Sequence, residues 1–310
     1  MKKQLLITLL PLLALTACNK NSTYKLDLSV ASPAGAPATA FYKYLTSDNL
    51  EVDSNANNIL SYFAGTNKDV IVAPTNYGIK VIKDGTAAYK IAANITFGNF
   101  YLLATGKDSD STLNEGDKII AFQQNGVGGK LFNYVYGDLN LETTYLEDGS
   151  AIVKQIIAGK GELDADYVLL AQPAVNNVLS KFSSFSVYAN VQNDYKTKSG
   201  GKEITQASIF VRNGLNKNVI ENFLSNIEND VKELLEDPKT AIDKYDGKVE
   251  DEIFSGKLSS TKEDLVKLLT DNNQIGLGYK DAYSNKESID AFIGTLGMGA
   301  TSEEIYFRID

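Results

Sequence analysis

The sequence predicts an α/β protein of two lobes, and two observations support this fold class. Short apolar segments with the pattern of strands alternate with helical segments along the 310-residue chain. Strands that alternate with helices form parallel sheets covered on both faces. A chain of this length also usually divides into two lobes, because single hydrophobic cores stop growing near this size.

The first residues indicate export and a lipid anchor. Lys2 and Lys3 precede an apolar run over residues 5–15, and small residues then lead to Cys18. This order is that of a secretion signal, and the run is shorter than the about 20 residues of a membrane helix. The segment Leu15-Thr16-Ala17-Cys18 resembles a lipobox. That resemblance implies removal of a signal peptide over residues 1–17, acyl chains on Cys18 and a tether over residues 18–23.

Composition argues against several functional classes. The chain has no histidine and one cysteine, so histidine-based catalysis, imidazole metal sites and intrachain disulfides are absent. The net charge of −9 disfavours nucleic acid, whose affinity rests on basic side chains. We expect no enzyme activity, no cofactor and no metal. Catalysis by carboxylates, lysine or tyrosine is disfavoured and stays an alternative.

The first lobe begins with strand, loop and helix, repeated. Turn-forming residues over 32–37 interrupt the apolar pattern, and Pro37 suits the first turn of a helix. The expected elements are a strand over 24–31, a helix over 38–45, a helix over 55–63, a strand over 69–73 ended by Pro74, and a loop over 75–78 before a helix that ends near Gly85.

A strand-like run over 89–105, interrupted at Gly98-Asn99, is interpreted as the crossing to the second lobe. The second lobe repeats the pattern of the first. Its expected elements are a strand over 118–122, a glycine turn over 126–129, a helix from about Lys130, a helix over 148–158, and a strand over 167–171 stopped by Gln172-Pro173 with a helix after it.

The last third of the chain is expected to return to the first lobe. Strands over 185–193 and 204–212 flank a polar turn at 196–202, and apolar residues spaced by three to four from Ile220 to Leu235 predict a long helix. Asp237-Pro238 ends that helix, and Ser260 with Glu263 suggests a capping box. The expected division is 24–98 with 203–310 as lobe 1 and 99–202 as lobe 2, with hinges near 95–99 and 192–202.

This order of segments resembles the periplasmic binding protein type 2 fold, in the branch that includes sulfonate, nitrate and thiamine-precursor binders. The resemblance rests on Ser32 to Phe41, Val70 to Gly78, the turn at 126–129, and Asp166 to Pro173. It implies two lobes joined by two crossover strands. It also implies the role of a solute-binding subunit of an ABC importer. The implied partners are a small-molecule ligand, the permease and ATPase subunits, and the membrane through Cys18, with the protein acting as a monomer on the extracytoplasmic face.

The loops that follow the strands predict the ligand cleft. Ligands of α/β sheets bind outside the carboxyl ends of the strands, and helix N-termini there offer free N–H groups. The glycine turn is neither a dinucleotide fingerprint nor a P-loop, because Leu131 stands where each needs another residue. The expected ligand-binding residues are Pro33, Gly35, Ala36, Pro37, Thr39, Thr75, Asn76, Tyr77, Gly98, Asn99, Asn125, Gly126, Gly128, Gln172 and Pro173.

The sequence therefore predicts a lipoprotein that closes on a small polar or anionic ligand and delivers it to an importer. An adhesion or scaffold lipoprotein with the same two-lobed fold stays open as an alternative. The residues do not distinguish an anion from a neutral heterocycle.

Overall fold

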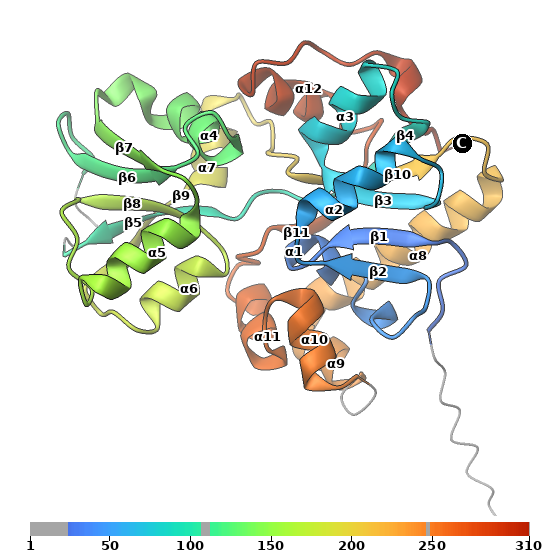
Figure 1. The fold of residues 1–310 in the computed structure, drawn as a ribbon, viewed down its shortest axis with the longest axis horizontal. Helices are drawn as coiled ribbons and strands as arrows, with labels where there is room; N and C mark the ends of the chain where they lie inside the picture. Colours follow the sequence, from blue (N-terminus) through green and yellow to red (C-terminus); the bar gives the residue numbers. More distant parts are fainter. Residues whose placement is uncertain (1–23, 107–111, 246–248, 310) are drawn as a thin grey trace, which may run out of the picture.

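Two α/β lobes lie side by side in the computed structural model (Figure 1). The structure describes residues 24–106, 112–245 and 249–309, so Cys18 and the expected signal peptide and tether lie outside the described residues. Within those ranges, no helix combines the length and apolar composition needed to cross a membrane. The predicted two-lobed α/β class is confirmed by the two separate sheets.

The sheet of lobe 1 has the strand order β11-β4-β10-β3-β1-β2. β1 runs parallel to β2 and β3, while β10 is antiparallel to both β3 and β4. The strands are β1 (Val30–Pro33), β2 (Leu50–Asp53), β3 (Val70–Pro74), β4 (Tyr89–Thr96), β10 (Ala207–Arg212) and β11 (Leu277–Asp281). The helices are α1 (Ala36–Thr39), α2 (Ala56–Ser61), α3 (Thr75–Lys83), α8 (Lys217–Glu236), α9 (Pro238–Asp243), α10 (Asp251–Leu258), α11 (Lys262–Thr270) and α12 (Lys286–Thr295).

The sheet of lobe 2 has the order β7-β6-β8-β5-β9. β6 is parallel to β7 and β8, and β5 is antiparallel to β8 and β9. The strands are β5 (Phe100–Thr105), β6 (Lys118–Phe122), β7 (Glu142–Leu146), β8 (Tyr167–Ala171) and β9 (Phe185–Asn190). The helices are α4 (Val127–Tyr136), α5 (Gly149–Ala158), α6 (Ala174–Leu179) and α7 (Val191–Lys198).

The chain passes between the sheets twice, once between β4 and β5 and once between α7 and β10. The sheet of lobe 1 therefore contains strands that precede lobe 2 in the sequence and strands that follow it. The domain boundaries at residues 98/99 and 202/203 stay a prediction.

Several central elements match their predicted ranges. β6 and β8 span the predicted residues, and α5 begins after Asp148, whose carboxylate accepts from the backbone N of Ala151. The long predicted helix is α8, and Asp237 ends it. The carboxylate of Asp237 then caps α9, which has Pro238 in its first turn.

The expected strand over 24–31 is wrong for its first part, because only Val30 and Ala31 of that range pair within the sheet. Side chains bond several of the backbone groups before Val30 instead. Ser29 N donates to the Asp69 carboxylate at 3.0 Å, and Asn49 Nδ2 donates to the Leu26 carbonyl at 2.6 Å.

The expected loop at 75–78 is the first turn of α3. This helix packs tightly on β10, since a Cβ at Gly78 would lie 2.1 Å from the Phe210 ring. The expected helix over 38–45 is divided into the short α1 and a 3₁₀ turn at Tyr42–Tyr44.

The expected strand over 185–193 stops at Asn190, whose side chain caps α7 by accepting from Asn193 N. Lys196 and Lys198 are therefore helical, and the predicted turn is shorter than expected. The cap before α11 is shifted by one residue: Thr261, not Ser260, accepts from the backbone N of Asp264.

A buried polar chain links the central strands of lobe 1. Asn94 Nδ2 donates to Ser208 Oγ at 2.8 Å, and Ser208 Oγ shares a hydrogen bond of 2.5 Å with Thr75 Oγ1. Asn285 Nδ2 continues the chain to Asn94 Oδ1 at 2.8 Å. Ser208, Thr75 and Asn94 are fully buried, so each depends on this chain for its hydrogen bonds.

We expect Ser208→Ala to lower the free energy of unfolding by about 1–3 kcal/mol, because it leaves two buried polar groups without a partner. The measurement is urea unfolding followed by circular dichroism. The matched control is Ser54→Ala at an exposed bend, which should change stability little. Equal effects of the two substitutions would contradict the assigned role of the chain.

Candidate functional site

A cavity of about 450 Å³ lies between the lobes, and we call it the inner cavity. It is lined at the carboxyl ends of five strands, by Pro33 (β1), Pro74 (β3), Thr96 (β4), Phe122 (β6) and Ala171 (β8). Asn99 of the first crossover and Phe100, the first residue of β5, also line it. The inner cavity is thus formed by both lobes at the position where α/β sheets bind ligands.

Eight of the fifteen predicted site residues line the inner cavity. They come from the loop after β1, the first crossover, the start of α4 and the end of β8: Pro33, Gly35, Ala36, Pro37, Asn99, Gly128, Gln172 and Pro173. The loop after β1 and the end of β8, which are more than 130 residues apart in the sequence, therefore line the same cavity. Whether these residues bind a ligand stays a prediction.

The other seven predicted residues are not among those lining the inner cavity. Thr39 and Thr75 are fully buried, and their hydroxyl groups bond the Gly35 carbonyl at 3.1 Å and Ser208 at 2.5 Å. Tyr77 packs against Phe63, with ring centroids 6.1 Å apart. Asn76 follows Thr75 in the first turn of α3, and its Oδ1 is buried without a hydrogen-bond partner among the described residues.

Gly98, Asn125 and Gly126 shape the chain next to the inner cavity. Gly98 has φ +97°, and a Cβ there would lie 2.5 Å from the Gln192 side chain, so the first crossover needs glycine at this point. Asn125 is exposed in the turn before α4. Gly126 closes that turn by donating its N–H to the Gln123 carbonyl at 2.7 Å.

The start of α4 faces the inner cavity with unused backbone donors. Gly126 precedes α4 and provides no side-chain cap, and the first helical residues, Val127 and Gly128, both line the cavity. The first N–H groups of a helix have no acceptor within it and carry the positive end of its dipole. A Cβ at Gly128 would lie 2.9 Å from the Phe122 ring, so only glycine fits between the first turn of α4 and this ring without a shift.

Among the described residues that line the inner cavity, none carries a charged side chain. The apolar surface includes the rings of Phe100 and Phe122, whose centroids are 6.2 Å apart. Uncharged polar groups come from Thr96, Asn99, Gln123, Gln172, Gln206 and Ser259. This combination suits a compact ligand with an apolar face and a few hydrogen-bonding groups. Within the described ranges, no cluster of acidic residues is arranged to hold a metal.

Thr96 is a site residue that sequence reasoning missed. Its side chain is 1% exposed and lines the inner cavity, and its Oγ1 has no hydrogen-bond partner among the described residues. An unpaired buried hydroxyl is costly, and the position of Thr96 in the wall of the cavity makes it a candidate ligand contact. Thr205 shares the burial and the unpaired Oγ1 but is not among the lining residues.

Amide side chains join the two crossovers at the wall of the inner cavity. Asn99 Nδ2 donates to the Gln172 carbonyl at 3.1 Å, and Gln206 Nε2 donates to Asn99 Oδ1 at 3.3 Å. The backbone N of Gln206 also donates to the Thr96 carbonyl at 2.9 Å. Asn99 and Gln206 stand on different crossovers, so these bonds hold the two connections together.

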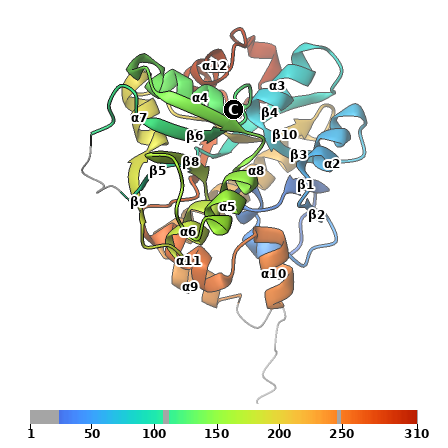
Figure 2. The same ribbon diagram turned by 60° about the vertical axis from the view of Figure 1, so that its left-hand side comes forward.

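A second and larger space of about 1040 Å³, which we call the outer cleft, lies beside the inner cavity. Its walls are α6, β9 and the start of α7 from lobe 2, and residues 259–274 from lobe 1. Pro173 and Ser259 line both spaces. α6 and α11 lie side by side at this place in both ribbon views (Figure 1, Figure 2).

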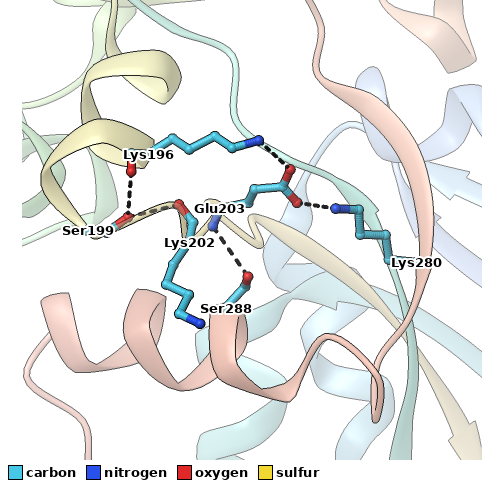
Figure 3. Close-up of polar contacts among 6 residues, drawn as sticks. All are labelled: Lys196, Ser199, Lys202, Glu203, Lys280 and Ser288. Carbon is cyan, nitrogen blue, oxygen red and sulfur yellow. Dashed lines mark hydrogen bonds and ion pairs between the residues drawn. The ribbon is translucent and has the colours of Figure 1, made fainter.

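The second crossover carries an ion network that connects both lobes (Figure 3). Glu203 accepts from Lys196 of α7 at 3.2 Å and from Lys280 of β11 at 2.5 Å. Its backbone N donates to Ser288 Oγ at 3.3 Å. Burial alone would raise the pKa of Glu203, but the bonds from Lys280 and Lys196 outweigh burial and lower it. Glu203 thus ties the second crossover to α7 of lobe 2 and to β11 of lobe 1.

Comparisons with known proteins identify the fold. No protein-family model matches the chain, and no curated protein matches its sequence. A solved structure described as an ABC transporter from Parabacteroides distasonis is 17% identical, with a TM-score of 0.69 over 94% of this chain and 100% of that chain. The ligand-binding component of an ABC-type import system from Staphylococcus aureus is 12% identical, with a TM-score of 0.62 over 90% and 95%.

The periplasmic aliphatic sulphonate binding protein of Escherichia coli is 10% identical, with a TM-score of 0.58 over 91% of this chain and 96% of that chain. These similarities confirm that the chain has the periplasmic binding protein fold along most of its length. At such low identity they establish the fold alone.

We expect Glu203→Gln to lower the free energy of unfolding by about 1 kcal/mol at pH 7, a value kept small because solvent screens a partly exposed carboxylate. The lowered pKa means that this contribution is present above the usual glutamate pKa of about 4.3 and is lost as the pH falls below it. Melting curves at pH 7 and pH 3.5 measure the difference, which should shrink at the lower pH.

The control is Glu115→Gln, at an exposed position of lobe 2. A difference between wild type and Glu203→Gln that is the same at both pH values would contradict the role of the ion network.

Proposed function

We propose that this chain is an extracytoplasmic solute-binding lipoprotein that captures a small ligand between its lobes and delivers it to an ABC importer. The inner cavity is the observation that carries the proposal. It combines the carboxyl ends of strands from both lobes with the uncapped start of α4. A space formed by two lobes on two crossovers can open and close by hinge motion, which is how such proteins bury a ligand.

The lining of the inner cavity favours a neutral polar ligand with a flat apolar part. A multiply charged anion would lose its hydration without gaining a lysine or arginine, and burying an unpaired charge is costly. A single anionic group is compatible with the free N–H groups at the start of α4. Phe100 and Phe122 provide the apolar wall against which a flat ring would pack.

The predicted site residues that line the inner cavity are proposed as ligand contacts, together with Thr96, Gln123 and Gln206. Gln123 has φ +52°, an uncommon conformation for a residue other than glycine, and such conformations are concentrated at functional sites. Cys18 is proposed as the lipid anchor. The partner is proposed to be a membrane permease with its ATPase, because one structural neighbour is described as an ABC transporter and another as the ligand-binding component of an ABC-type import system.

The experiment that tests the proposal is a thermal-shift screen of the mature chain with Cys18→Ser. The panel consists of neutral heterocycles, amino acids, sulfonates, nitrate and phosphonates. A true ligand at 100 times its Kd stabilises the folded state by about 2.7 kcal/mol, and titration calorimetry then gives its affinity. Failure of every class to stabilise the protein would favour the alternative of a scaffold lipoprotein.

For a ligand found in that screen, we expect Thr96→Val to weaken binding by about fivefold to tenfold, because the variant removes one hydrogen bond of about 1 kcal/mol or slightly more. Stability of the ligand-free protein should not fall, since valine removes an unpaired buried hydroxyl. Thr205→Val is the matched control: it removes an equally unpaired hydroxyl outside the cavity lining. Equal affinities of both variants would exclude Thr96 as a ligand contact.

We expect the membrane-extracted protein to lack residues 1–17 and to carry lipid on Cys18. Intact-mass analysis measures this directly. Cys18→Ser should release the protein from the membrane fraction, because no acyl chain can then form on that residue. A mature protein with a free thiol at Cys18 would disprove the anchor without affecting the ligand site.

A further inference from the structure

Two glutamines from different lobes are hydrogen-bonded where the inner cavity adjoins the outer cleft. Gln172 lines the inner cavity, and Gln274 lines the outer cleft. Gln172 Nε2 donates to Gln274 Oε1 at 2.6 Å. Gln172 follows β8 of lobe 2, whereas Gln274 lies between α11 and β11 of lobe 1. Their hydrogen bond therefore crosses from lobe to lobe at the boundary of the two spaces.

The orientation of both amides follows from their neighbours. The backbone N of Asn176 donates to Gln172 Oε1 at 3.3 Å, so the other end of the Gln172 amide is the donor. Its Nε2 then has two protons and two acceptors, Asn176 Oδ1 at 3.2 Å and Gln274 Oε1 at 2.6 Å. Gln172 is 5% exposed, and Gln274 acts as the acceptor in the bridge.

A second bond holds Gln274 through its backbone. The Tyr101 hydroxyl of β5 donates to the Gln274 carbonyl at 3.2 Å. Burial raises the pKa of Tyr101 to about 12, so this hydroxyl stays protonated at physiological pH. Lobe 2 thus holds residue 274 by both its side chain and its main chain.

The segment that carries Gln274 also contacts the first crossover. The backbone N of Phe97 donates to the Gly276 carbonyl at 2.7 Å. Gly276 has φ +63°, and a Cβ there would lie 2.0 Å from the Gly98 carbonyl. Because Phe97 and Gly98 contact Gly276 directly, a movement of the first crossover would also move the segment before β11.

We infer that Gln274 is the latch of the binding site, which closes the inner cavity toward the outer cleft by accepting a hydrogen bond from Gln172. The inference rests on the proposed function, because it assigns a role to a residue at the same site. Opening the lobes separates Gln274 from both Gln172 and Tyr101, and the outer cleft then becomes the path to the inner cavity. Gln172 acts in this conformation as the partner of the latch, since both of its Nε2 protons are donated to protein groups.

The latch is weak enough to release without a ligand. In the open state water replaces each partner, so one such hydrogen bond changes an equilibrium by only about fivefold. A bond of this size favours the closed form and still allows the lobes to separate when a ligand enters or leaves.

The experiment measures lobe separation by electron spin resonance distances in the ligand-free mature chain with Cys18→Ser. Spin labels are placed by Ser183→Cys on lobe 2 and Glu263→Cys on lobe 1, at exposed positions outside the cavity linings. Gln274→Met keeps the length of the side chain and removes the acceptor. Gln274→Glu keeps an acceptor for Gln172 Nε2.

We expect Gln274→Met to lower the ratio of short to long distances by about fivefold and Gln274→Glu to restore it. Tyr101→Phe, which removes the other bond, should also lower the ratio. Melting curves check that each variant is folded. A distance distribution unchanged by Gln274→Met, or shifted equally by Gln274→Met and Gln274→Glu, would overturn the inference. Because no ligand is present, this result is independent of whether the ligand screen succeeds.

Discussion

The two crossovers are the constraint on which the site depends. They bring the carboxyl ends of strands from two separate sheets to one place, and the bonds among Asn99, Gln172 and Gln206 hold them there. The inner cavity lies at that place because β1, β3 and β4 end on one side of it and β6 and β8 on the other. Neither lobe alone would enclose a ligand, so binding and the relative position of the lobes are inseparable.

Charged side chains lie at the second crossover and not in the described lining of the inner cavity. Ion pairs gather at the second crossover, where Glu203 lies between Lys196 and Lys280, while the described lining of the inner cavity carries no charged side chain. Ion pairs near the surface are screened by solvent and contribute modestly, so those at the second crossover would oppose the proposed hinge motion only weakly. An uncharged cavity avoids the cost of an unpaired buried charge in the empty protein, which agrees with the proposal of an uncharged or weakly charged ligand.

The central strands and the edge strand β9 could be predicted from the sequence, whereas the edge strands β2, β7 and β11 could not. β3, β6 and β8 are continuous apolar runs because neighbouring strands and helices cover them. β2, β7 and β11 each stand at the edge of a sheet, and most of their residues are half-buried or exposed. An edge strand is held by one neighbour, so its own composition needs no apolar run. These three strands were absent from the sequence-based description for that reason.

The sequence by itself determined the two-lobed α/β class and the loops that line the inner cavity, because these depend on local order and on the direction of parallel strands. Eight of the fifteen expected residues reach the inner cavity for the same reason. The secretion signal stays a prediction. Only the tertiary structure decided which hydroxyl lies at the inner cavity and which amide accepts a hydrogen bond from Gln172. Thr96 and Thr205 are alike in type and burial, yet only Thr96 is among the lining residues. Gln274 meets Gln172 across 102 residues of chain, a contact that exists only when both lobes are folded and closed on each other.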